Sequence, residues 1–386
     1  MRLSPLVSKV EPSVTLELNA KAKAMAARGV SVIALAAGEP DFLPPKGAME
    51  AVRRALDEGR CKYTPTPGIP ELRQGVAEYL GRFGIKARTA QVVLSTGGKQ
   101  ALHNVIAAVV APGDEVLLPS PWWVSYPPLV EISGGRCVTV PSPKGAILDV
   151  PALEKACTSK TTAIILNSPN NPSGLVVSAR ELEDLADLCE RRNLTVISDE
   201  LYAELVYSPH RHLSPAALPK LAERTCTVGG FSKCFAMTGW RLGYSVTPEP
   251  VARAIEAYQS HITSNANSLA QYAALGALKG SDAEVESMRA VFARRRQLIH
   301  KGLNAVRGFS CPEPQGAFYA FPDVTGAMAN LGFKDDVALS HHILEKVGVA
   351  LVPGSAFGAP GHMRLSYAAA DAELEEALRR LQRACS

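Results

Sequence analysis

The stretch from Gly229 to Tyr244 constrains the fold of this chain more than any other: Gly-Gly-Phe-Ser-Lys-Cys-Phe-Ala-Met-Thr-Gly-Trp-Arg-Leu-Gly-Tyr. It follows the short β-like run 225–228 and contains too much glycine, serine and threonine for a regular helix. We therefore expect an irregular loop that leaves the end of a strand, where α/β sheets place their ligand sites. Lys233 lies at its centre among small and apolar residues, and Arg241 follows in the same loop.

These two side chains indicate a particular chemistry. A lysine surrounded by apolar groups loses solvation, which lowers its pKa and frees the amine for Schiff-base chemistry. Arg241 stays charged, and its planar guanidinium suits a phosphate. A Schiff-base lysine beside a phosphate anchor is the arrangement that a pyridoxal phosphate site requires. Taken alone, Lys233 would more often be a solvated surface lysine, so the interpretation depends on matching motifs elsewhere.

Length and composition exclude several other classes of protein. The 386 residues are 47% hydrophobic and 20% charged, with a net charge of +4. This balance indicates a globular protein with a sizeable core, in one large or two medium domains. The densest basic run, 294–296, lies on a helical pattern, where a solvated helix face is favoured over a nucleic-acid-binding face. We therefore predict no nucleic-acid partner.

Cysteine usage and hydropathy bear on the compartment. The eight cysteines are scattered, with no Cys-x-x-Cys pair. This pattern argues against a metal site and a disulfide framework, and fits a reducing cytosol. The first ten residues lack the apolar segment of a signal peptide, and no run reaches the length of a membrane-spanning helix. We expect a cytoplasmic protein without a membrane partner.

The lysine loop also resembles a known family. Residues 232–243 read Ser-Lys-x-Phe-x-Met-x-Gly-x-Arg-x-Gly, similar to the cofactor-lysine motif of class I/II pyridoxal-phosphate aminotransferases. The resemblance is strongest to bacterial aspartate aminotransferases and their aspartate/prephenate-using relatives. It runs nearly end to end, from Ala37-Gly38-Glu39-Pro40-Asp41-Phe42 to Arg364-Leu365-Ser366-Tyr367-Ala368.

The resemblance implies an α/β fold, that of the aspartate aminotransferase-like transferases of fold type I. The large domain then holds a mostly parallel central sheet with helices on both faces, beside a smaller α/β domain. The implied division is an N-terminal arm and part of the small domain at 1–45, the large cofactor-binding domain at 46–283 and the small C-terminal domain at 284–386.

Four residues are predicted to surround the cofactor ring. Asp199 ends an apolar run and must be paired to remain ionised in a dry site, although a helix cap is the alternative. By resemblance, Asp199 keeps the pyridine nitrogen protonated, and Tyr202 hydrogen-bonds the cofactor's 3′-oxygen. Asn171, before a proline, resembles the residue whose amide donates to that oxygen. Of the two adjacent tryptophans, the family pattern assigns Trp123 to stack on the ring and Trp122 to packing.

A second group is predicted to hold the phosphate. Gly98 lies where a strand turns into a helix, and free N–H groups at a helix start attract anions, although turn geometry alone is the default interpretation. Lys99 adds a positive charge and, in the subgroup, recognises the distal carboxylate of a dicarboxylic substrate. By resemblance, Tyr63 reaches the neighbouring subunit's phosphate, which implies a homodimer with shared active sites. Gly230 replaces a serine common in the family, so one phosphate contact is expected to be missing.

The substrate is predicted to meet a third group. Arg364 lies in an alternating apolar strand, where a lone buried guanidinium needs an anion or an internal salt bridge. The resemblance implies a bidentate clamp on the substrate's α-carboxylate. It also places the backbone N–H of Gly38 against that carboxylate, and Thr15 on the substrate side. Trp123 and Asn171 border the substrate as well.

Together these residues predict a pyridoxal 5′-phosphate-dependent aminotransferase. Lys233 serves as the general base, and the amino group passes between an L-amino acid, aspartate or glutamate, and a 2-oxo acid in a ping-pong cycle. Alternatives within the fold are an aminotransferase for aromatic or alanine-like substrates or prephenate, or a C–S β-lyase. Alternatives of another functional class are a cofactor-binding regulator with this fold and a catalytically silent, structural dimer. Lys99 favours the dicarboxylic substrates.

Overall fold

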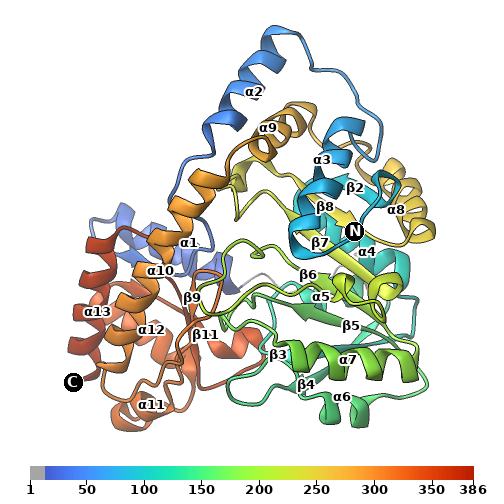
Figure 1. Ribbon diagram of the computed structural model, residues 1–386. Coiled ribbons are helices and arrows are strands. Elements are labelled where there is room, and N and C mark those ends of the chain that lie inside the picture. The colour runs from blue at the N-terminus through green and yellow to red at the C-terminus, as the bar shows by residue number, and fades with distance from the viewer. Residues whose placement is uncertain (1–13) are drawn as a thin grey trace, which may run out of the picture.

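A computed structural model describes residues 14–386, the side chains at 14–16 and 19 excepted. A seven-stranded sheet forms its centre, with the strand order β2-β8-β7-β6-β5-β3-β4 (Figure 1). The strands are β2 (Val92–Ser95), β3 (Glu115–Ser120), β4 (Arg136–Pro141), β5 (Thr161–Asn167), β6 (Thr195–Asp199), β7 (Thr225–Gly230) and β8 (Gly243–Val246). All neighbours are parallel except the two pairings of β8, with β2 and with β7. The sheet is therefore mostly parallel, as the sequence predicts.

Helices cover both faces of this sheet, because its strands are apolar on both sides. Along β3, Leu117 packs into a cluster with α6 and α7, whereas Val116 and Leu118 pack on the other face with α4, α5 and α8. This alternation follows from the two-residue period of a strand, and near-continuous apolar runs are typical of covered parallel sheets. The helices of this part are α2 (Lys46–Asp57), α3 (Pro70–Leu80), α4 (Gly98–Val109), α5 (Tyr126–Ile132), α6 (Val150–Ala156), α7 (Ala179–Arg192), α8 (Glu249–Ile262) and α9 (Ser268–Leu278).

A smaller unit combines both ends of the described chain. Strand β1 (Ile33–Ala34) pairs in parallel with β10 (Val349–Ala350), and β11 (Val352–Pro353), β12 (Met363–Ser366) and β9 (Tyr319–Ala320) form an antiparallel sheet. Its helices are α1 (Val14–Ala27), α10 (Asp282–Asn304), α11 (Thr325–Leu331), α12 (Asp336–Val347) and α13 (Asp371–Cys385). Figure 1 shows α13 and α2 at opposite ends of the molecule. The domain boundaries at 45 and 283 stay predictions.

The carboxyl ends of the central strands lie next to one another. Asn167, the last residue of β5, is in register with Asp199, the last residue of β6, and Asp199 is in register with Val228 of β7. Open α/β sheets bind ligands beyond these strand ends. Within residues 14–386, no helix is both long enough and apolar enough to cross a bilayer.

Candidate active site

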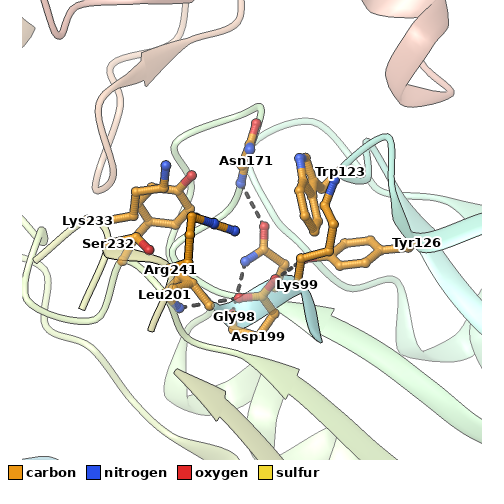
Figure 2. A pocket seen from close by; sticks show the side chains of 12 residues that line it. Gly98, Lys99, Trp123, Tyr126, Asn171, Asp199, Leu201, Ser232, Lys233 and Arg241 are labelled. Atoms are coloured by element: carbon orange, nitrogen blue, oxygen red, sulfur yellow. Dashed lines mark hydrogen bonds between the residues drawn. The ribbon is translucent and has the colours of Figure 1, made fainter. Parts of the chain in front are cut away.

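A pocket of about 590 Å³ opens at these strand ends (Figure 2). It is lined by Gly98, Lys99, Trp123, Tyr126, Asn167, Asn171, Asp199, Leu201, Tyr202, Ser232, Lys233 and Arg241. The structure thus brings together every residue that the sequence predicts for the cofactor except Tyr63.

Lys233 lies in the irregular loop between β7 and β8. Ala236 and Arg241 adopt left-handed backbone conformations there, with φ of 50° and 51°, so the loop cannot continue as a helix or strand. The ammonium of Lys233 donates a hydrogen bond to the carbonyl oxygen of Gly38. Burial lowers the pKa of Lys233 to about 8, and the positive charges of Arg364 and Arg241 act in the same direction. A sizeable fraction of this amine is therefore neutral near physiological pH.

Asp199 is held at the end of β6 by two neighbours that the sequence analysis did not identify. Tyr126 donates its phenolic hydrogen to Oδ2 at 2.7 Å, and Asn167 donates to the Asp199 carbonyl oxygen at 2.9 Å. Burial raises the pKa of Asp199 to about 6, against the lowering effect of the Tyr126 hydrogen bond. The carboxylate is still mostly ionised at neutral pH. Asn167 could have been found from the strand pattern, because it ends β5 as Asp199 ends β6.

Positive groups converge at the N-terminus of α4. Gly97 precedes the helix with φ of +83°, and a Cβ there would lie 2.7 Å from Nη2 of Arg241. The guanidinium therefore lies directly against the helix start, where free N–H groups attract anions. Lys99 extends from the first turn, with Nζ 4.9 Å from the centre of the Trp123 ring. Partial burial lowers the pKa of Lys99, and Arg241 lowers it further.

Arg364 lies on β12, outside the pocket lining but bonded to Asn171, which lines it, and is 2% exposed. Its Nη1 donates to Oδ1 of Asn171 at 2.9 Å, and its Nη2 donates to the carbonyl oxygen of Ala36 at 2.7 Å. Its Nε is buried without a partner among the described residues. No carboxylate from that part of the chain lies within salt-bridge distance of it, so the internal salt bridge that the sequence left open is not formed there. Arg364 is a buried cation with neutral partners.

Of the two adjacent tryptophans, both pack against the same hydrophobic cluster, but only one lines the pocket. Trp123 lines the pocket, and Figure 2 shows it beside Lys99, across from Lys233. The backbone N–H of Trp122 instead donates to the Phe357 carbonyl oxygen at 3.0 Å. Ser232, immediately before the lysine, also lines the pocket and was not identified from the sequence. Gly230 has no hydroxyl at the position where the family commonly has serine, and Ser232 is the hydroxyl-bearing residue nearest to it in sequence.

Besides Arg364, three predicted residues lie outside the pocket lining. Tyr63 is 93% exposed and does not reach the pocket of its own chain. The side chain of Thr15 is outside the described residues, although its backbone belongs to the first turn of α1. Gly38 contributes through its backbone, whose carbonyl meets Lys233.

The charges of this lining complement pyridoxal phosphate. Lys233 offers a nucleophilic amine for an aldehyde, and Asp199 offers a carboxylate for a ring nitrogen. The α4 N-terminus with Arg241 offers a cradle for a phosphate. A carboxylate of the substrate would complete the surroundings of Arg364. The residues present therefore fit this cofactor.

Known proteins resemble the chain over its whole length. Residues 30–381 match the family described as aminotransferase class I and II. A probable aspartate/prephenate aminotransferase of Aquifex aeolicus is 44% identical over 99% of this chain and 98% of its own length. An aspartate aminotransferase of Bacillus subtilis is 41% identical over 99% of this chain and 98% of its own.

Solved structures agree with this assignment. The aspartate aminotransferase from Thermus thermophilus with maleate has a TM-score of 0.95 at 42% identity, covering 100% of both chains. The enzyme from Rhizobium meliloti has a TM-score of 0.95 at 38% identity, covering 100% of this chain and 99% of its own. The predictions of family, fold type I, transamination and cofactor are thereby confirmed. The chain belongs to the class I and II aminotransferases, enzymes that use pyridoxal 5′-phosphate to move an amino group between an amino acid and a 2-oxo acid.

Proposed function

We propose that this aminotransferase uses a dicarboxylic amino acid, aspartate or glutamate, as its amino donor. The observation that carries the proposal is a pair of cations: Lys99, which lines the pocket, and Arg364, which is bonded to the lining residue Asn171. Neither has a carboxylate within salt-bridge distance among residues 14–386. A dicarboxylic amino acid supplies one negative charge for each, and charge-assisted hydrogen bonds are about twice as strong as neutral ones.

The names of the relatives support the same substrate class. The Bacillus subtilis relative is called an aspartate aminotransferase, and the Aquifex aeolicus relative a probable aspartate/prephenate aminotransferase. Prephenate is itself a 2-oxo acid with a second carboxylate. The same pair of cations therefore suits it as an amino acceptor.

The reaction assigns a distinct task to each side chain. Bound pyridoxal phosphate supplies an electron-accepting ring that stabilises negative charge on the substrate's α-carbon. Lys233, with its lowered pKa, accepts the proton from that carbon and returns it, a role that contributes roughly 10²–10⁴-fold. Asp199, oriented by Tyr126, holds the proton on the ring nitrogen. Arg364 orients the substrate through its α-carboxylate, so that the Cα–H bond faces Lys233.

The other predicted residues hold the ligands in place. Trp123 packs on the ring, and Asn171 and Tyr202 donate hydrogen bonds to its 3′-oxygen. The backbone N–H of Gly38 and the side chain of Thr15 complete the substrate side.

We also propose that the active unit is a homodimer in the cytoplasm. Tyr63 is 93% exposed, which suits a side chain that completes the phosphate site of a second copy. The cysteines, all of which lie in the described part of the chain, are free, which fits a reducing compartment.

Mixed subunits test the shared site. Chains carrying Lys233→Ala and chains carrying Tyr63→Ala are each expected to be nearly inactive, and co-refolding them should restore activity, because one pocket of the mixed dimer is intact. Absence of recovery, with mixed dimers demonstrated by two affinity tags, would show that Tyr63 acts within its own chain or not at all.

Lys99→Ala tests the substrate class. We expect kcat/KM for aspartate to fall roughly 10- to 150-fold, the equivalent of a charge-assisted hydrogen bond, while kcat/KM for alanine stays within about twofold. Lys99→Arg, which keeps the charge, is the matched control and should retain most of the aspartate activity. Equal losses with both amino acids would place Lys99 at the phosphate alone and remove the argument for a dicarboxylic donor.

A further inference from the structure

Two buried tyrosines form an isolated hydrogen bond behind the pocket. The phenolic oxygens of Tyr202 and Tyr319 are 2.9 Å apart, and their rings meet edge to face at 83°. Tyr202 follows the end of β6 in the large sheet, whereas Tyr319 belongs to β9 of the small one. Within the described residues, neither hydroxyl has another hydrogen-bond partner. The bond therefore joins the two units of the molecule beside the cofactor site.

Tyr319 is also fixed on its other sides. The guanidinium of Arg364 lies 4.7 Å from the centre of its ring, a cation–π distance. Its hydroxyl lies so close to Gly38 that a Cβ on this glycine would collide with it. Tyr319 is 1% exposed. One side chain thus contacts three residues that the proposed function assigns to the ligands: Tyr202, Arg364 and Gly38.

The surroundings decide which phenol donates. The pair holds two hydroxyl protons, of which one lies in the bond and the other must point elsewhere. Tyr202 lines the pocket where the cofactor would lie and Tyr319 does not, so a proton left free on Tyr202 can meet the cofactor. Burial raises the pKa of both phenols and Arg364 lowers it for both, while the hydrogen bond between them lowers the pKa of Tyr319 and raises that of Tyr202. This direction agrees with Tyr319 as the donor.

We propose that Tyr319 is a positioning residue that donates its proton to Tyr202 and thereby directs the Tyr202 O–H into the pocket, while its ring supports Arg364. The hydroxyl then serves the cofactor and the ring serves the substrate's carboxylate. This inference rests on the proposed function, because it takes Tyr202 to face the ring oxygen of the cofactor.

The bound cofactor itself provides the readout. A donor to the ring oxygen stabilises its negatively charged form, so it lowers the pH at which the absorption of the bound cofactor changes. In the holoenzyme, Tyr319→Phe removes only the hydroxyl and should raise this midpoint by roughly 0.4–1 pH unit, the equivalent of one neutral hydrogen bond. KM for aspartate should change less than about twofold, because the ring under Arg364 remains.

The substitutions at Tyr319 and Tyr202 leave the charged groups near these two phenols unchanged. Arg364 and Asp199 act on the phenols, and Lys233 is influenced in turn by Glu39 and Arg241. A matched control is Tyr367→Phe, which also removes one buried hydroxyl from the small unit. The Tyr367 hydroxyl donates to the Ala317 carbonyl oxygen at 3.2 Å, away from the pocket. The pH midpoint of the cofactor absorption in Tyr367→Phe should equal that of the wild type.

A double-mutant cycle completes the test. Tyr202→Phe alone should raise the midpoint, and adding Tyr319→Phe to it should produce no further shift, because the donor has lost its target. Tyr319→Leu, which removes the ring, should raise KM for aspartate at least about fivefold. A Tyr319→Phe midpoint equal to that of Tyr367→Phe, or a full additional shift in the double variant, would overturn the assignment. A wild-type protein with no pH-dependent absorption from a lysine-bound cofactor would instead contradict the proposed function, and this assignment with it.

Discussion

Two buried arginines of the small unit differ in what surrounds them. Arg295 of α10 is 7% exposed and donates two hydrogen bonds to Asp41, at 2.7 and 2.8 Å, and one to Asp371 at 2.8 Å. Arg364 is 2% exposed and donates only to an amide oxygen and a backbone carbonyl. Among the described residues, the first cation is neutralised by carboxylates and the second is not.

This difference separates a structural charge from a ligand-binding one. A buried cation costs several kcal/mol unless an anion compensates it. At Arg295 the compensation is internal, and the ion pairs tie the segment before α2 to α10 and α13. At Arg364 the described residues supply no such anion. On the proposed function, the substrate's carboxylate supplies it when it binds.

The largest expected effect is at another cation, Lys233. Lys233→Ala removes both the attachment point of the cofactor and the proton carrier, so kcat should fall by at least roughly 10²–10⁴-fold. The circular dichroism spectrum should stay unchanged, because the side chain has no internal ion pair. Borohydride reduction followed by peptide mapping should find the cofactor on residue 233 in the wild type alone. Label on another lysine would contradict the assignment.

Arg364→Leu should separate binding from stability. Losing a buried partner of a carboxylate costs about 2–5 kcal/mol, so kcat/KM for aspartate should fall roughly 30- to several-thousand-fold. The free energy of unfolding of the apoprotein should not decrease, because an uncompensated buried charge disappears. Steady-state kinetics and urea denaturation measure the two quantities. A strongly destabilised variant would mean that Arg364 has a structural role like that of Arg295.

Arg295→Leu should show the opposite pattern. It leaves Asp41 without its partner and Asp371 with Arg294 alone, and because both carboxylates are partly exposed the free energy of unfolding should fall by about 1.5–3 kcal/mol. KM for aspartate should remain within about twofold in the protein that stays folded. The comparison between the two arginines fails if this variant loses substrate affinity but not stability.

A smaller effect concerns the pH dependence of cofactor uptake by the apoprotein. The neutral amine is the nucleophile, and the pKa of Lys233 is lowered to about 8. The uptake rate should therefore rise with pH, reach half its maximum near pH 8 and level off above it, whereas an unperturbed lysine would continue to about 10.4. Arg364→Leu removes one positive charge that lowers this pKa, so it should move the midpoint upward. Arg295→Leu should leave it in place. Stopped-flow absorption at several pH values checks all three.

Local patterns were enough to predict much of the fold. The apolar run that ends at Asp199 located β6, and the glycine- and serine-rich motif located the lysine loop. The extent of other elements depends on their pairing partners. The apolar run 32–36 forms a strand only at Ile33–Ala34, because just two residues of β10 pair with it. Helix α10 ends at Asn304, whose side chain hydrogen-bonds to the backbone of Cys311.

The site was predicted where a residue's own motif identifies its chemistry, as at Lys233 and Asp199. It was missed where the role comes from contact alone. Tyr126 is 73 positions from the carboxylate it bonds, and Tyr319 is 117 positions from Tyr202. No local pattern specifies such pairs, since they depend on which strands become neighbours.

On the proposed function, the neutral surroundings of Arg364 also determine which amines are not substrates. A simple monoamine or a diamine could reach Lys233, but it carries no acid group, so the guanidinium would stay dry and uncompensated. Sites that depend on a polar group of the substrate reject analogues lacking it by roughly 10⁴–10⁵-fold. On this proposal, the enzyme does not react with decarboxylated amines, and it needs no steric barrier to exclude them.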